Sequence, residues 1–126
     1  MNQRENPRHG LIVAEGASET AVVLSAVGTI DMLTAPQLQT HVDSVLSRRP
    51  SAFIVDLSRV EFLGSAGINV LANAHNQAED VDFGVVADGP ATSRPLRLLG
   101  IDTLIPIYPT LADAVDALDT GESRTG

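Results

Sequence analysis

The chain contains no cysteine, no tryptophan and no lysine, so all of its 8 basic residues are arginine. Without cysteine it forms no disulfide, no thiolate metal site and no cysteine nucleophile. Aromatic residues make up only 3% of the chain, which excludes the stacking platforms that bind single-stranded nucleic acid. No apolar run approaches the roughly 18 residues of a membrane-spanning helix, and no secretory signal pattern is present. We therefore expect a soluble, cytoplasmic protein with no membrane insertion.

The charge balance is acidic, with 16 acidic residues against 8 basic ones and a formal net charge of -8. This charge opposes direct binding to phosphate backbones or anionic membranes. The chain also lacks a glycine-rich nucleotide loop ending in Gly-Lys-Ser/Thr and lacks histidines and carboxylates at metal-ligand spacing. We therefore expect no cofactor, no metal and no direct nucleic-acid partner, so that any role in transcription acts through protein.

A chain of 126 residues fits one domain that can bury a core without disulfides or metals. Residues 1–10 and 119–126 are polar, carry proline or glycine and lack an apolar period, which predicts flexible tails around a folded domain at 11–118.

Inside this domain, hydrophobic periodicity predicts strands alternating with helices. Strands are expected at residues 11–15, 21–27, 52–56, 81–87 and 104–108, and helices at 34–46, 65–77, 93–99 and 111–118. Pro36 suits a first helical turn, and Thr110 is the expected N-cap of the last helix. An initial strand pair followed by alternation predicts an α/β fold, a mixed sheet of about five strands with about four helices mostly on one face.

Ser65 is the most informative single residue. The apolar run from Phe53 to Val55 is closed by Asp56, and after a short loop Ser65 begins a helix, where it is the expected N-cap. Gly64 and Gly67 leave room beside its hydroxyl for another chain's backbone or a phosphate. On spacing alone, an ordinary capping serine is the favoured interpretation.

The same segment resembles a family signature. Asp56-Leu57-Ser58, then Phe62-Leu63 and Gly64-Ser65-Ala66-Gly67, resemble the motif of the STAS domain, the fold of bacterial anti-sigma factor antagonists. Gly28 to Asp31 resembles the turn that leads into the family's first helix, and Leu98 to Ala114 resembles its closing elements. The resemblance covers residues 11–118 and implies a single STAS-like domain.

By this resemblance, the protein binds an anti-sigma factor when unphosphorylated and thereby regulates sigma-factor-dependent transcription, for example in a stress response. The anti-sigma factor is itself a serine kinase that phosphorylates Ser65, and a PP2C-like phosphatase restores the hydroxyl. Asp31, Gly64, Ser65, Ala66 and Gly67 are the expected partner surface. The protein is then a substrate and a binding module, with no catalytic residue of its own. From local chemistry alone, Asp31 is a turn residue and Asp56 is structural.

A second interpretation is a STAS-like scaffold of a stressosome or an accessory subunit of a lipid ABC transporter, without a phosphorylation cycle. It stays open because Gly64 stands where the family commonly has Asp, and Ala66 where it has Ser or Thr.

A third interpretation, a serine hydrolase, is disfavoured. A nucleophile elbow needs glycine two residues before the serine, where this chain has Leu63. His75 lies ten residues along the same expected helix, about 15 Å from Ser65, His41 lies on a different helix, and His9 lies in the N-terminal tail.

Overall fold

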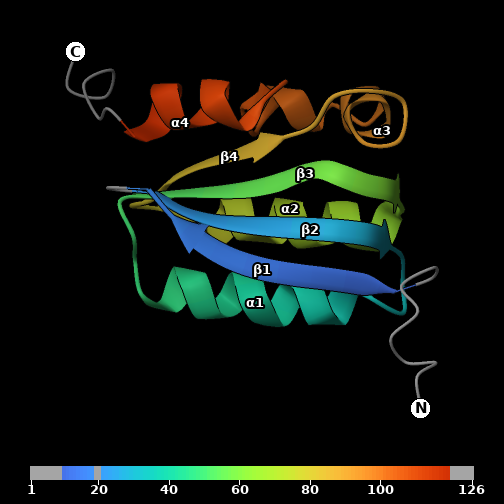
Figure 1. The fold of residues 1–126 in the computed structure, drawn as a ribbon, viewed down its shortest axis with the longest axis horizontal. Coiled ribbons are helices and arrows are strands. Elements are labelled where there is room, and N and C mark those ends of the chain that lie inside the picture. Colours follow the sequence, from blue (N-terminus) through green and yellow to red (C-terminus); the bar gives the residue numbers. More distant parts are fainter. Residues whose placement is uncertain (1–9, 19–20, 120–126) are drawn as a thin grey trace.

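The computed structural model describes residues 10–18 and 21–119, which form a five-stranded sheet flanked by helices (Figure 1). The strands are β1 (Leu11–Ala17), β2 (Ala21–Ile30), β3 (Ala52–Leu63), β4 (Asp82–Val86) and β5 (Ile107–Tyr108). The helices are α1 (Ala35–Ser47), α2 (Ser65–Gln77), α3 (Ser93–Leu98) and α4 (Leu111–Asp119), with a 3₁₀ turn, η3 (Ile101–Thr103), after α3. The expected α/β fold is confirmed.

The sheet has the order β1-β2-β3-β4-β5 and is mixed. β1 pairs antiparallel with β2, whereas the pairs from β2 to β5 are parallel. Because parallel strands end at the same edge of a sheet, the loops that follow β2 and β3 lie side by side (Figure 1). The helices α1 and α2 therefore begin next to each other, at the edge where Ser65 is found.

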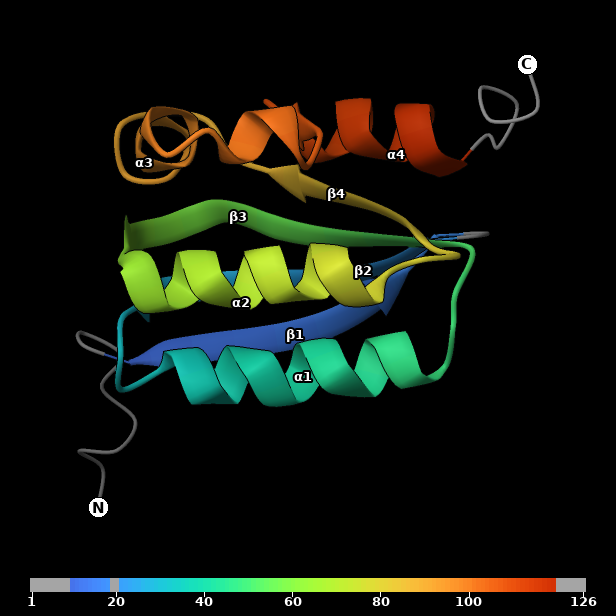
Figure 2. The same ribbon diagram turned by 180° about the vertical axis from the view of Figure 1, so that it is seen from behind.

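Two hydrophobic cores lie on opposite faces of the sheet. The larger core joins the sheet to α1, α2 and α3, and Figure 2 shows α1 and α2 in front of the strands. The smaller core joins the other face to α4. β3 serves both, since Phe53 and Val55 belong to the larger core and Ile54 to the smaller one. Among the described helices, α4 alone packs on the other face, which confirms helices mostly on one face.

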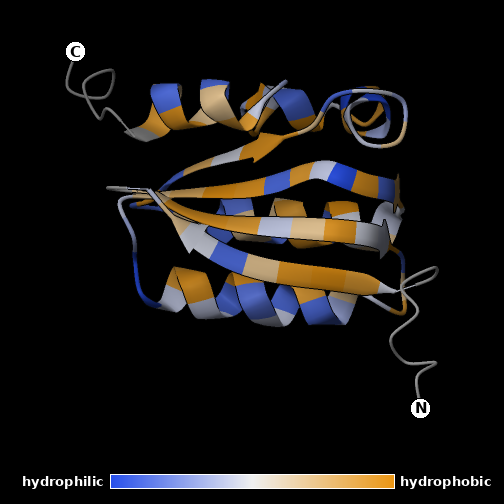
Figure 3. Cartoon of the chain, in the orientation of Figure 1, coloured by the Kyte–Doolittle hydropathy of each residue, from blue (hydrophilic) through white to orange (hydrophobic). Residues whose placement is uncertain are grey.

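β3 is much longer than the sequence predicts, because it continues past Asp56 to Leu63. Its second half keeps Leu57, Val60 and Leu63 buried, while polar residues between them are exposed. Figure 3 shows this change from a continuous hydrophobic half to a mixed half. Shifts in the pairing of β2 with β3 break the simple alternation, which hides the strand from a periodicity analysis. The expected loop before α2 therefore shrinks to one residue.

The other differences from the predicted boundaries are small. β5 holds only two residues, because Ile101–Thr103 form a 3₁₀ turn and Ile105 is buried outside the sheet. Thr110 caps α4 as predicted, since its Oγ1 accepts a hydrogen bond from the backbone N–H of Asp113 at 3.1 Å. Most of both expected tails, residues 1–9 and 120–126, lies outside the described residues, and the domain boundaries stay a prediction.

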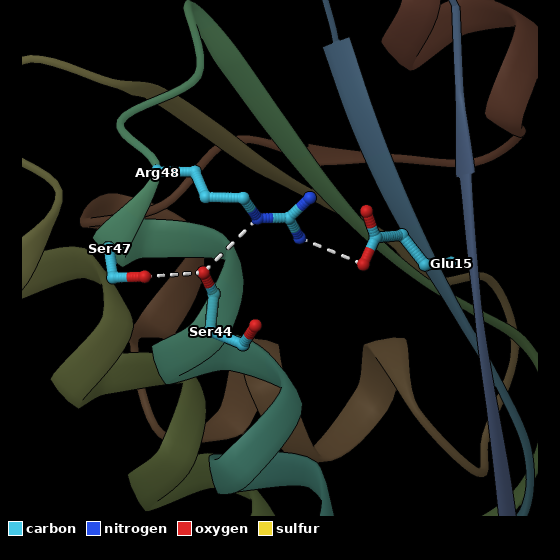
Figure 4. Close-up of polar contacts among 4 residues, drawn as sticks. All are labelled: Glu15, Ser44, Ser47 and Arg48. Carbon is cyan, nitrogen blue, oxygen red and sulfur yellow. Dashed lines mark hydrogen bonds and ion pairs between the residues drawn. The ribbon is translucent and has the colours of Figure 1, made fainter.

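A surface contact ties the far end of α1 to the edge strand (Figure 4). The Arg48 guanidinium donates a hydrogen bond to Glu15 Oε1 at 2.8 Å and another to the Ser44 carbonyl at 3.3 Å. The bond from Arg48 holds the pKa of Glu15 below its ordinary value and raises the pKa of Arg48. Both side chains are exposed, so solvent screens the pair and it contributes little stability.

No helix in the described part of the chain is long and apolar enough to cross a membrane.

Candidate functional site

Ser65 is the exposed first residue of α2, and the N-cap is Gly64. The predicted capping role of Ser65 is therefore wrong by one position. β3 runs without a loop to Leu63, so that the extended Gly64 (φ -91°, ψ 178°) is the only residue between strand and helix. This helix end has no side-chain cap, and the Ser65 hydroxyl makes no hydrogen bond to any described residue. The hydroxyl is thus exposed and contributes no hydrogen bond to the described fold.

One backbone hydrogen bond brings the two loops of the site together. The Gly64 N–H donates to the carbonyl of Ile30, the last residue of β2, at 2.9 Å. Asp31 follows Ile30 directly, and Ser65 follows Gly64. The structure therefore brings four of the five expected partner-binding residues to one end of the sheet: Asp31, Gly64, Ser65 and Ala66.

Gly67, the fifth residue, faces the interior instead. A Cβ at this position would lie 2.4 Å from Ile30 Cγ2 and 2.7 Å from Leu63 Cδ1. The room that the sequence suggested beside Ser65 is thus filled by the protein's own side chains. Gly67 is needed because the first turn of α2 approaches the ends of β2 and β3 too closely for any side chain.

Asp31 organises the turn between β2 and α1, as its local chemistry predicted. Its Oδ1 accepts hydrogen bonds from the N–H groups of Leu33 at 2.9 Å and Thr34 at 3.1 Å. Thr34 Oγ1 in turn accepts from the Asp31 N–H at 2.9 Å and donates to the Thr29 carbonyl at 2.8 Å. The bond from the Thr34 N–H is the main cause that lowers the pKa of Asp31.

Large apolar side chains are exposed around this site. Met32 is 76% exposed, Leu33 84% and Phe62 53%. Met32 and Ala66 also line one shallow groove of about 390 Å³ between α1 and α2. Exposed apolar side chains beside a polar centre are typical of a protein-binding surface. This surface was not predicted from the sequence, although Met32 and Leu33 form an apolar pair inside a polar turn.

The histidines do not support hydrolysis. His75 lies in the last turn of α2 and His41 in the middle of α1, and neither forms a hydrogen bond with Ser65. His9 lies outside the described residues. The described ranges also hold no group of three or more potential ligands that could bind a metal ion.

Comparison with known proteins shows the family of this chain. The model of the STAS domain matches residues 12–114, so this chain belongs to the STAS-domain family of anti-sigma factor antagonists.

The anti-sigma-F factor antagonist RsfB of Mycobacterium tuberculosis is 42% identical over 100 residues, which cover 79% of this chain and 82% of that protein. The crystal structure of an anti-sigma factor antagonist from Mycobacterium paratuberculosis is also 42% identical, with a TM-score of 0.86 over 88% of this chain and 96% of that one. The unphosphorylated form of SpoIIAA shares the fold at 14% identity, with a TM-score of 0.70 over 86% of this chain and 97% of that chain.

We predict that Gly67→Ala destabilises the protein by about 1 to 2 kcal/mol. Overpacking a tight site costs about 1 to 3 kcal/mol, and the better helix propensity of alanine returns at most about 1 kcal/mol. Urea unfolding measures the difference. Gly16→Ala is the matched control, because a Cβ there meets nothing within 4 Å. Equal stability of Gly67→Ala and the parent protein would contradict the close approach of α2.

We also predict a pH-dependent contribution from Asp31. The lowered pKa means that its ionised form stabilises the folded state above the ordinary pKa of the unfolded chain. This contribution is lost as the pH falls through the lower, folded pKa. Urea unfolding of Asp31→Asn and the parent protein should therefore differ at neutral pH and converge in acid. A difference that does not change with pH would refute the prediction.

Proposed function

We propose that this protein is a phosphorylation-controlled anti-sigma factor antagonist whose switch is Ser65. Unmodified, it binds an anti-sigma factor through the surface of Asp31, Gly64, Ser65 and Ala66, which releases the sigma factor for transcription. The observation that carries the proposal is an exposed hydroxyl with no partner, at an uncapped helix start, within an exposed apolar surface.

The helix start favours a phosphate on Ser65. The N–H groups of Ser65 and Ala66 in the first turn form no hydrogen bond to a described residue and no side chain caps them, whereas the Gly67 N–H donates to the Gly64 carbonyl at 3.0 Å. The helix dipole also places partial positive charge there, so that the phosphorylated chain keeps its fold. SpoIIAA has solved structures named for both its unphosphorylated and its phosphorylated form, which supports extending the same chemistry to Ser65.

Phosphorylation would act on the interface rather than on the fold. A phosphoryl group adds about -1.5 to -2 charge in the middle of an apolar contact surface. A partner shaped for a neutral hydroxyl must then desolvate this charge, which weakens docking by several kcal/mol if the contact is dry. Because the chain already carries a net charge of -8, an acidic partner surface would oppose docking further.

The kinase and the phosphatase come from outside the chain. We propose an anti-sigma factor with ATP-dependent serine kinase activity as the partner, and a PP2C-like phosphatase as the enzyme that reverses the modification. RsfB is described as an anti-sigma-F factor antagonist, which makes an anti-sigma-F-type factor the first partner to test. The proposed location is the cytoplasm, where sigma factors act.

The central test compares the affinity of Ser65 variants for that anti-sigma factor by calorimetry. Ser65→Ala should bind like the unmodified protein and stay bound after incubation with kinase and ATP. Ser65→Glu should bind at least about tenfold more weakly, which corresponds to about 1.4 kcal/mol. Ser51→Glu is the matched control, because Ser51 is also exposed but precedes β3 at the other end of the sheet.

Intact-mass analysis should find one phosphoryl group on the parent protein and none on Ser65→Ala. Equal affinity of all three Ser65 forms would remove Ser65 from the mechanism. Recovery with a multi-subunit particle or a membrane ATPase, without any small kinase, would favour the scaffold or transporter role.

A second test addresses the apolar surface. Leu33→Asp should weaken binding of the anti-sigma factor at least about tenfold, because it places a charge in a contact that must lose water. Its urea unfolding curve should stay close to that of the parent protein, since Leu33 is 84% exposed. Leu104→Asp, at an exposed leucine beside the end of α4 and away from this surface, should bind normally. Unchanged affinity of Leu33→Asp would exclude this surface.

A further inference from the structure

A second hollow lies on the opposite face of the sheet, where α4 begins. Its volume is about 310 Å³, and its lining comes from the middle of β2, the middle of β3 and the first residue of α4: Ser25, Ala26, Val27, Asp56, Ser58, Arg59 and Leu111. Asp56 and Ser58 belong to the segment that resembles the family signature, yet the proposed switch at Ser65 uses neither of them.

A bulge in β3 shapes this hollow. Ser25 pairs with Asp56 and Val27 pairs with Arg59, so β3 advances three residues while β2 advances two. Asp56 Oδ1 accepts a hydrogen bond from the Ser58 N–H at 2.9 Å, which satisfies the backbone at the bulge. Bulges of this kind redirect side chains and are common beside binding sites. Here the bulge gathers three polar side chains of one strand around a single cavity.

The two charges of the cavity do not neutralise each other. The Asp56 carboxylate and the Arg59 guanidinium both line it, yet they form no ion pair with each other. In the described structure, Asp56 uses only Oδ1 in a side-chain hydrogen bond, and the hydroxyls of Ser25 and Ser58 form none. A partly buried carboxylate and an exposed guanidinium therefore line the same cavity, and neither is paired with the other.

We propose that this cavity binds a small zwitterion, a free amino acid with an uncharged side chain. The ligand carboxylate would pair with Arg59, whose planar guanidinium suits a carboxylate. Its ammonium group would pair with Asp56 and donate to a serine hydroxyl, and its carbon chain would pack on Val27 and Leu111. A hollow of about 310 Å³ has room for a molecule of this size.

The proposal is tested by titrating the full chain with L-glutamine and following backbone amide shifts by NMR. The amides of residues 25–27 and 56–59 should shift in a saturable way. Two analogues test the zwitterion directly, since glutaramic acid lacks the α-ammonium group and 4-aminobutanamide lacks the carboxylate. Each should bind at least about tenfold more weakly, because one of two charge contacts is lost. Equal affinity of either analogue, or no saturable shift with L-glutamine, would overturn the proposal.

Variants assign the two charges. Asp56→Asn keeps an oxygen for the Ser58 N–H, so that the bulge persists, but removes the carboxylate. This variant should weaken the binding of L-glutamine at least about tenfold and leave the affinity for glutaramic acid unchanged. Arg59→Gln should weaken the binding of both L-glutamine and glutaramic acid. It should leave the affinity for 4-aminobutanamide, which has no carboxylate, unchanged.

Arg97→Gln is the matched control, since Arg97 is an exposed arginine of α3 outside this cavity. L-glutamine affinity that is the same in Arg59→Gln and Arg97→Gln would refute the site. None of these measurements involves an anti-sigma factor, so their outcome is independent of the proposed switch.

Discussion

The site depends on the close approach of α2 to the ends of β2 and β3. The Gly64 N–H bonds the Ile30 carbonyl, and Gly67 lets the helix rest on Ile30 and Leu63 without an intervening side chain. This contact fixes where α2 starts, and hence where Ser65 lies. It also places the turn of Asp31 beside Ser65, since Asp31 follows Ile30 in the chain. Two loops that are more than 30 residues apart in sequence thereby become one surface.

The same contact separates the role of the two glycines in the motif. Gly64 is the partly exposed helix cap, where a Cβ would lie 3.1 Å from the exposed ring of Phe62 and in ordinary contact with the Ile30 carbonyl oxygen at 3.6 Å. Gly67 lies below it and is required by packing. A residue with a side chain at Gly64 therefore needs only a small movement of an exposed ring, whereas at Gly67 it needs a movement of the core. Position 64 is thus free to vary chemically, which is consistent with its departure from the family's usual Asp.

Much of this structure could be predicted from the sequence, because local signals dominate it. Thr110 indicated the start of α4, and the apolar run from Phe53 to Val55 indicated a strand buried on both faces. The length of β3 could not be predicted, because it depends on bulges in its pairing with β2, which is a non-local property. The cap at Ser65 was misplaced for the same reason, since the position of a cap follows from where the preceding strand ends.

The apolar surface around Ser65 and the second cavity could not be predicted from the sequence for a related reason. Met32 and Leu33 look like core residues by their type, and only the turn of Asp31 turns them outward. Asp56 and Arg59 look like ordinary polar strand residues, and only the register against Ser25 and Val27 gathers them at one cavity. In each case the residue type was visible, but its direction was set by a hydrogen bond or a pairing that no single segment encodes.

β3 links these features while keeping them physically distinct. Its buried residues Leu57, Val60 and Leu63 belong to the larger core and lead directly to the start of α2. Its polar residues Asp56 and Arg59 line a cavity beside α4. A charge change in that cavity removes no buried apolar contact from the larger core, so it should leave the packing under Gly67 intact. The strand can therefore position the start of α2, and with it Ser65, at its end and carry the proposed binding cavity along its length.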